Sequence, residues 1–175
     1  YLVKMALEMK KFNQEVRFLL AGDGYEVDQL SHLAEKYGIL NQTLFFINYL
    51  PKDQMPSLLS AATVTTSFFI DLPEMQNNSA NKFFDALAAG KPIMINYEGW
   101  QADLLHETQA GLVVPADDPR TAAEQLNTLI SDHATLRKMG TASRHLASRF
   151  DVETCFKLFA NSIDTAYDIH QGNIS

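Results

Sequence analysis

The residues with the clearest chemical potential lie in residues 77–92, which read NNSANKFFDALAAGKP. The polar first part leads directly into a short amphipathic helix, and Gly90 is expected to end that helix as a C-terminal cap. A helix N-terminus binds anions well, because its free backbone N–H groups and the helix dipole point the same way. Asp85 lies one turn after Lys82 and is placed to accept hydrogen bonds from a sugar or ribose hydroxyl. We interpret this segment as a site for the diphosphate and ribose of a nucleotide-sugar.

The polar residues before this helix have two interpretations. Either Ser79 or Asn78 is predicted to cap the helix through its side chain, which leaves the other amides free to face phosphate. The simpler alternative is that these residues are ordinary loop polarity. In that case Asp85 is a solvated acid on the helix surface and Lys82 is a surface lysine.

Apolar runs and amphipathic stretches alternate along the whole chain, which predicts a parallel sheet with helices on both faces. Ligands of such sheets bind at the carboxyl ends of the strands, and the segment with Asp85 is expected at that edge. Residues 70–78 are expected to form the longest irregular loop. The acidic residues and proline of 116–119 predict a capped helix start. Strands are expected over residues 16–21, 44–48, 64–68, 92–96 and 111–115, and further helices over 1–11, 25–37, 51–62, 100–106, 120–130, 133–149 and 152–170.

Composition narrows the classes of function. The chain has 175 residues and a net charge of −7 with no evident basic face, which argues against nucleic acid as a partner. No apolar run approaches the ~20 residues of a membrane-spanning helix, and no secretory signal peptide is visible. The single Cys155 cannot form an internal disulfide, which fits a cytoplasmic location. We expect one domain over residues 1–175, with a C-terminal helix in residues 151–175.

No set of His, Cys and acidic residues shows the spacing of metal ligands, so we expect no metal. No Ser–His–Asp arrangement can be argued from these positions either.

The order of four motifs resembles the C-terminal, donor-binding domain of a GT-B glycosyltransferase of the retaining family 4 type. The resemblance covers nearly the whole chain. Its motifs are residues 21–24 (AGDG), 46–51 (FINYLP), 85–92 (DALAAGKP) and 110–115 (AGLVVP), the last followed by Asp118 and Pro119.

This resemblance implies a Rossmann-like half of a GT-B fold and the transfer of a sugar from a nucleotide-diphosphate-sugar donor, of the UDP or GDP type, with retention of configuration. The family signature is a Glu, seven residues and a second Glu, which falls here on Asn77 and Asp85. These two are the candidate catalytic residues. Asp85 matches the acid that binds the donor ribose. Asn77 replaces the acid that contacts the donor sugar, and it keeps hydrogen-bonding capacity but loses the charge.

The family loop usually carries glycines where this chain has Asn78 and Ala80, so the path of the loop is expected to differ. The glycines after the first strand match positions where the family backbone runs near the donor, and the residues after the second strand match the place where the base is held. The donor-binding residues implied by the resemblance are Gly22, Gly24, Tyr49, Leu50, Asn78, Ser79, Asn81, Lys82 and Asp85.

The resemblance also implies that the central strand of the sheet and the N-terminal domain are missing here. An acceptor glycan or lipid-linked sugar would bind through that domain, so this chain alone should bind donor without turnover. The common use of the family is bacterial envelope polysaccharide synthesis, with the full protein at the inner face of the membrane. Backbone left unpaired by the missing strand could support a homodimer. The alternatives are a nucleotide-sugar epimerase of the same fold and a non-catalytic α/β binding module.

Overall fold

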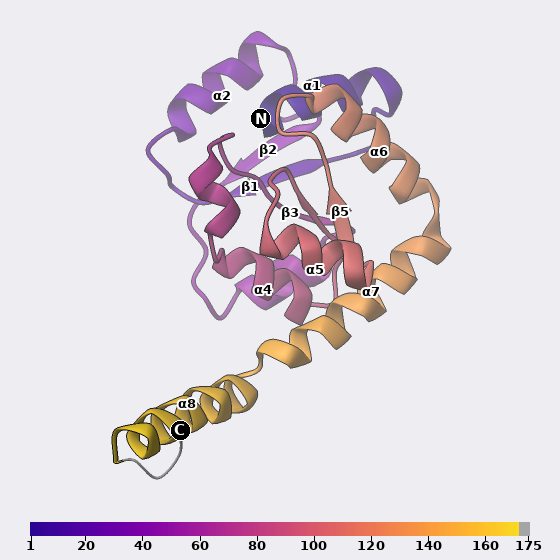
Figure 1. Cartoon of the computed structure of the whole chain (residues 1–175). Helices are drawn as coiled ribbons and strands as arrows, with labels where there is room; N and C mark the ends of the chain where they lie inside the picture. Colours follow the sequence, from indigo (N-terminus) through magenta and orange to yellow (C-terminus); the bar gives the residue numbers. More distant parts are fainter. Residues whose placement is uncertain (172–175) are drawn as a thin grey trace.

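The computed structural model describes residues 1–171, which form an α/β fold of parallel strands and surrounding helices (Figure 1). The strands are β1 (Phe18–Ala21), β2 (Leu44–Ile47), β3 (Thr65–Ser67), β4 (Ile93–Ile95) and β5 (Gly111–Val113). The α-helices are α1 (Leu2–Phe12), α2 (Val27–Lys36), α3 (Met55–Ala61), α4 (Asn81–Ala88), α5 (Trp100–Thr108), α6 (Pro119–Ser131), α7 (His133–Ala147) and α8 (Val152–Gln171). Two 3₁₀ helices are η1 (Pro73–Asn77) and η2 (Ser148–Phe150).

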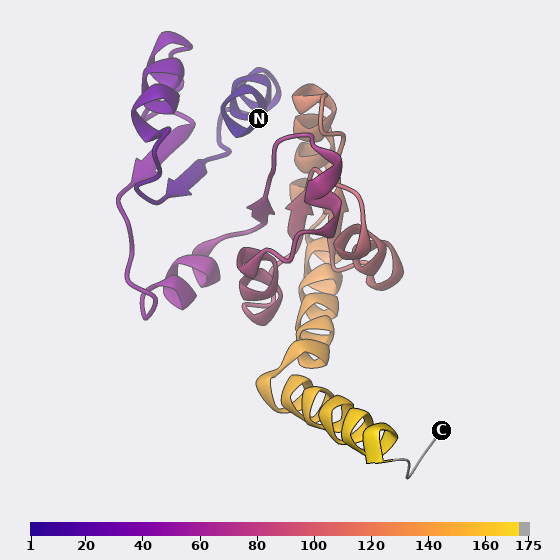
Figure 2. The same ribbon diagram turned by 60° about the vertical axis from the view of Figure 1, so that its left-hand side comes forward.

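The strands form two hydrogen-bonded sheets rather than the single sheet that the sequence predicted. β1 pairs with β2, and β4 lies between β3 and β5 (Figure 2). All of these pairs are parallel, as predicted. The physical reason for the division is that, within residues 1–171, no strand lies between β1 and β3, so each has one unpaired edge. The expectation that a central strand belongs there stays a prediction.

The two faces of β4 are covered by different helices, which confirms the predicted layers. Met94 belongs to a buried cluster that also contains Met9 of α1 and residues of α2 and α6. Ile93 and Ile95 belong to a second buried cluster, with Phe83 of α4 and residues of α5 and α7. This division follows from the two-residue repeat of a strand, in which neighbouring side chains face opposite sides.

Acidic residues begin the last helices of the body. Asp118, in the predicted capping segment, accepts hydrogen bonds from the backbone N–H groups of Arg120 at 3.1 Å and Thr121 at 3.0 Å. Asp132 does the same at the start of α7. Two hydrogen bonds from Thr121 hold the pKa of the Asp118 carboxyl below its usual value. The bond from the Thr121 hydroxyl contributes most, followed by the bond from its backbone N–H.

Helix α8 extends away from the body of the molecule (Figures 1 and 2). The sequence predicted a C-terminal helix in residues 151–175; α8 covers Val152–Gln171, and residues 172–175 lie outside the described residues. None of its residues is buried, and seven large apolar side chains on it are exposed, among them Phe156 and Phe159. In residues 1–171, no helix combines the length and the apolar character that crossing a membrane requires.

Candidate functional site

The segment between β3 and α4 carries the signature positions. β3 and β4 run parallel, so both end at the edge of the sheet where this segment begins. Asn77 is the last residue of η1, a short 3₁₀ helix inside the predicted irregular loop. Asn78 and Ala80 have φ values of −69° and −71°. Because this backbone is extended, neither position needs the left-handed conformation that would favour the glycines of the family.

The predicted side-chain cap of α4 is wrong. The N-cap residue is Ala80, and no side chain within residues 1–171 caps the first turn. Asn78 and Ser79 precede the cap position because the chain stays extended until Asn81. The backbone N–H groups of the first turn are therefore without a side-chain acceptor, which keeps the positive end of this helix open to an anion.

The two charged residues of α4 lie one turn apart. Lys82 places its Nζ atom 5.0 Å from the centre of the Phe69 ring, a cation–π geometry. Partial burial lowers the pKa of Lys82. Asp85 is exposed, whereas Phe83 and Leu87 of the same helix face the core. Gly90 has a φ of 66° just after α4, which confirms the predicted end of this helix.

The other predicted donor-binding residues follow the strands of the β1–β2 sheet. Residues 77–85, by contrast, lie between β3 and β4 of the other sheet. Gly22 follows β1 with a φ of 147° and donates its N–H to the carbonyl of Ile47 at 3.0 Å. Gly24 accepts a hydrogen bond from the N–H of Val27 at the start of α2. Tyr49 and Leu50 follow β2, and the side chain of Tyr49 is 62% exposed.

Three contacts fix the segment between β3 and α4 to the turn between β4 and α5. The Asn96 side chain accepts a hydrogen bond from the Phe69 N–H at 2.8 Å and donates one to the Phe69 carbonyl at 2.9 Å. Trp100 donates its Nε1–H to the carbonyl of Asn78 at 3.2 Å. Gly99 lies so close to Gln76 that a β-carbon there would come within 2.2 Å of the Gln76 carbonyl oxygen. These contacts were not predicted from the sequence. The one available signal was Asn96, a polar residue that directly follows the buried strand β4.

Aromatic rings connect Lys82 to the end of β4. The Phe69 ring, over which Lys82 lies, is 4.9 Å from the ring of Tyr97. Tyr97 donates its hydroxyl to Gln101 Oε1 at 2.7 Å, and the hydroxyl lies 3.3 Å from Ser67 Oγ at the end of β3. Burial raises the pKa of Tyr97. The ring is therefore held in one position between β3 and α5.

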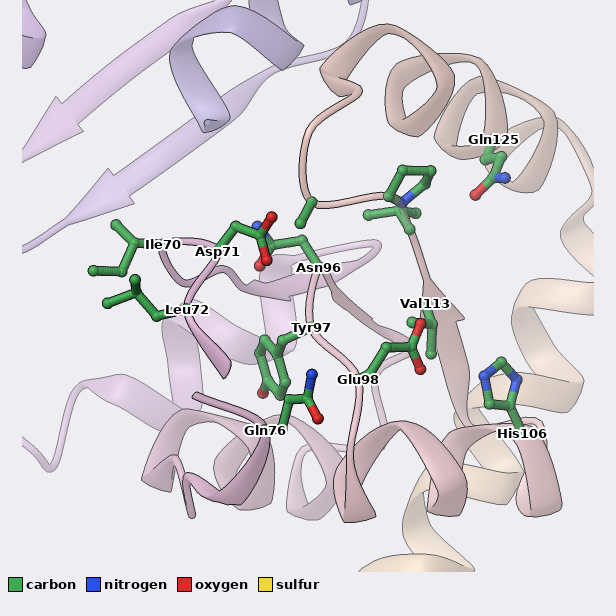
Figure 3. Close-up of a pocket in the computed structure, with 13 residues that line it drawn as sticks. Ile70, Asp71, Leu72, Gln76, Asn96, Tyr97, Glu98, His106, Val113 and Gln125 are labelled. Carbon is green, nitrogen blue, oxygen red and sulfur yellow. The ribbon is translucent and has the colours of Figure 1, made fainter. Parts of the chain in front are cut away.

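A cavity of about 350 Å³ lies at the carboxyl ends of β4 and β5, beside η1 (Figure 3). Asp85 and Lys82 are not part of its lining, and the other candidate catalytic and donor-binding residues predicted from the sequence do not line it either. In the view of Figure 3, the Glu98 side chain lies between those of Gln76 and His106. The lining residues are Ile70, Asp71, Leu72, Gln76, Asn96, Tyr97, Glu98, His106, Val113, Val114, Pro115, Ala116 and Gln125.

The residues that the structure describes contain no group of three or more His, Cys, Asp or Glu side chains placed to hold a metal ion. The expectation that no metal is needed stays a prediction.

Comparison with solved structures supports the fold. The chain superposes with a TM-score of 0.80 on the Anabaena protein Alr3699/HepE, which was crystallised in complex with UDP, at 19% identity over 93% of this chain and 44% of that one. It superposes with a TM-score of 0.78 on the sucrose-phosphate synthase tll1590 of Thermosynechococcus elongatus, at 18% identity over 95% of this chain and 42% of that one. The fold is one half of the GT-B architecture.

Curated relatives are considerably longer than this chain. Spore coat protein SA of Bacillus subtilis (strain 168) is 24% identical over 127 residues, which are 72% of this chain and 33% of the relative. A D-inositol 3-phosphate glycosyltransferase of Corynebacterium urealyticum is 27% identical over 138 residues, which are 78% of this chain and 31% of the relative. The chain thus spans about a third of their length. The family described as "Glycosyl transferases group 1" matches residues 1–146, and the chain belongs to that family.

Proposed function

We propose that this chain is the nucleotide-sugar-binding lobe of a retaining glycosyltransferase. The observation that carries the proposal is the start of α4, where the first-turn N–H groups have no side-chain acceptor and Lys82 lies in the same turn. A diphosphate needs both features, since the N–H groups bind its oxygens and the ammonium offsets its charge. Family membership supports the assignment, and so does the solved relative that was crystallised with UDP.

We assign the individual roles from the family resemblance, and the positions of the residues support them. Asp85 binds the ribose, since its exposed carboxylate lies one turn beyond the phosphate-binding N–H groups. Asn77 contacts the donor sugar from the end of η1. The amides before α4 and Lys82 hold the diphosphate. Gly22 and Gly24 let the backbone approach the donor, and Tyr49 and Leu50 hold the base.

In the intact enzyme this lobe fixes the leaving nucleoside diphosphate. The negative charge on that group grows as the glycosidic bond breaks, and donors that are already in place lower the barrier because they need not reorganise. The acceptor binds elsewhere in the longer protein, so this chain alone binds donor without turnover. The names of two relatives, a spore coat protein and an exopolysaccharide phosphotransferase, favour a role in bacterial envelope polysaccharide synthesis. Which nucleotide the donor carries, UDP or GDP, is decided by comparing the affinities of the chain for the two.

The test is calorimetric titration of UDP and GDP into the intact protein and into the Asp85→Asn variant. Loss of a charged acceptor for ribose hydroxyls is expected to weaken binding by about 1–3 kcal/mol, or roughly 5- to 150-fold. Asp103→Asn is the matched control, because Asp103 is an exposed carboxylate on α5 outside the cavity. Equal affinities of wild type and Asp85→Asn would reject the ribose role of Asp85. If neither UDP nor GDP binds to the wild-type protein, the proposed function is rejected.

A further inference from the structure

The cavity beside η1 is chemically unlike the start of α4. Its lining contains the carboxylates of Asp71 and Glu98, the amides of Gln76 and Gln125 and the imidazole of His106, and it contains no lysine or arginine. A phosphate would therefore find no lysine or arginine partner among these residues. An uncharged, polyhydroxylated ligand would find hydrogen-bond acceptors and donors on several sides.

Apolar surface completes the match to a sugar ring. The Tyr97 ring is held by its hydroxyl, and Val113 and Pro115 provide further apolar wall. Pyranose rings combine hydroxyl groups at their edge with apolar C–H faces, so a cavity with amides, carboxylates and an aromatic ring suits them. The Asn96 amide is already engaged by the Phe69 backbone and shapes the cavity rather than offering hydrogen bonds to a ligand.

Two connections join the cavity to the segment that we assign to the donor. Gln76 lines the cavity and directly precedes Asn77. Tyr97 lines the cavity, and its ring packs on Phe69, which in turn packs under Lys82. The cavity and the phosphate-binding turn are thus two compartments with a single aromatic layer, Phe69, between the Tyr97 wall and the Lys82 ammonium.

We propose that this cavity receives the sugar of the donor and that Glu98, with Asp71, selects an uncharged sugar over a uronic acid. The inference rests on the proposed function, since it assumes a nucleotide-sugar ligand. A uronic acid would bring a third carboxylate into a space that already holds two, and no lysine or arginine lines the cavity to relieve this repulsion. A neutral hexose keeps its hydroxyl contacts and carries no such penalty.

The test compares UDP-glucose with UDP-glucuronate in the intact protein, each measured by competition against the free nucleotide. If GDP is the nucleotide that binds, GDP-mannose and GDP-mannuronate replace them. In wild type we expect the neutral donor to bind about tenfold tighter or more than the uronate. Glu98→Gln should reduce this ratio severalfold, and Glu98→Lys should reduce it further or reverse it. Asp103→Asn, which removes a carboxylate outside the cavity, should leave the ratio unchanged.

The free nucleotide separates this inference from the proposed function. It lacks the sugar, so its affinity should be the same in wild type and in Glu98→Gln. If neither UDP nor GDP binds, the proposed function fails and this inference fails with it. If a nucleotide binds but the neutral and uronate donors bind equally well, or if Glu98→Gln leaves their ratio unchanged, only the cavity assignment is wrong.

Discussion

Replacement of Asn96 by alanine should destabilise the fold through two specific hydrogen bonds. Asn96 is 2% exposed, and its amide bonds both the N–H and the carbonyl of Phe69, at 2.8 and 2.9 Å. Leaving a buried polar group unpaired costs about 1–3 kcal/mol. Phe69 is only partly buried, so water can compensate in part. We therefore expect the two groups together to cost about 1–3 kcal/mol of unfolding free energy.

Urea denaturation measures this loss. The midpoint should fall while the dependence of the unfolding free energy on urea stays the same, because the surface exposed on unfolding hardly changes. The variant should also bind UDP or GDP more weakly, because Phe69 lies in the segment that leads from β3 to α4. A loss of stability below about 0.5 kcal/mol, the range of an ordinary surface substitution, would refute the reasoning.

Asn96→Asp gives a sharper test of the same geometry. The carboxylate can still accept from the Phe69 N–H, but it faces the Phe69 carbonyl and is buried, so its pKa in the folded state should exceed the unfolded value of about 3.9. The folded state then binds the extra proton, so stability relative to wild type is greatest below about pH 3.9 and falls as the pH rises through the raised pKa. Asn96→Ala should show no such trend, and an Asp variant with a constant difference from wild type between pH 3 and 7 would contradict the assignment.

Three further predictions test other parts of the structure. Gly99→Ala combines a φ of 101° with a β-carbon 2.2 Å from the Gln76 carbonyl oxygen, so thermal unfolding should show a loss of about 2 kcal/mol or more. Asp132→Ala removes the cap of α7 and should lower Tm at pH 7; because these hydrogen bonds hold the Asp132 pKa below its usual value, the difference should shrink as the pH falls from about 4. Phe156→Glu on α8 should change Tm little, since this side chain is 68% exposed.

Local sequence signals predicted the elements well, because the causes of those elements are local. Alternation of apolar runs and amphipathic stretches placed all five strands within a few residues of their observed bounds. Gly90 ends α4, and Asp118 caps α6, as their residue types predict. At Gly90 and Asp118 the decisive interaction joins residues within about one turn of one another.

The candidate site depends on distant pairs, and these were not predictable. Asn96 looks like an ordinary polar residue after a strand, and its partner Phe69 is 27 positions away. The N-cap of α4 is Ala80 rather than Asn78 or Ser79, because the backbone remains extended beyond η1. No residue type in this segment specifies that extension. The cavity combines side chains from the β3–η1 segment, both strand ends and two helices, so only the folded chain brings Gln76 and Glu98 together.

The opposite electrostatic character of the two compartments constrains what this site can bind. The start of α4 offers N–H groups that no side chain caps and the Lys82 ammonium, whereas the cavity offers Asp71 and Glu98. A simple anion would match only the first compartment, and a neutral glycan only the second. A ligand with an anionic group joined to an uncharged polyhydroxylated ring matches both, and each compartment then also rejects the wrong end of the ligand. Under the proposed function, charge therefore favours one orientation of the donor over the reverse.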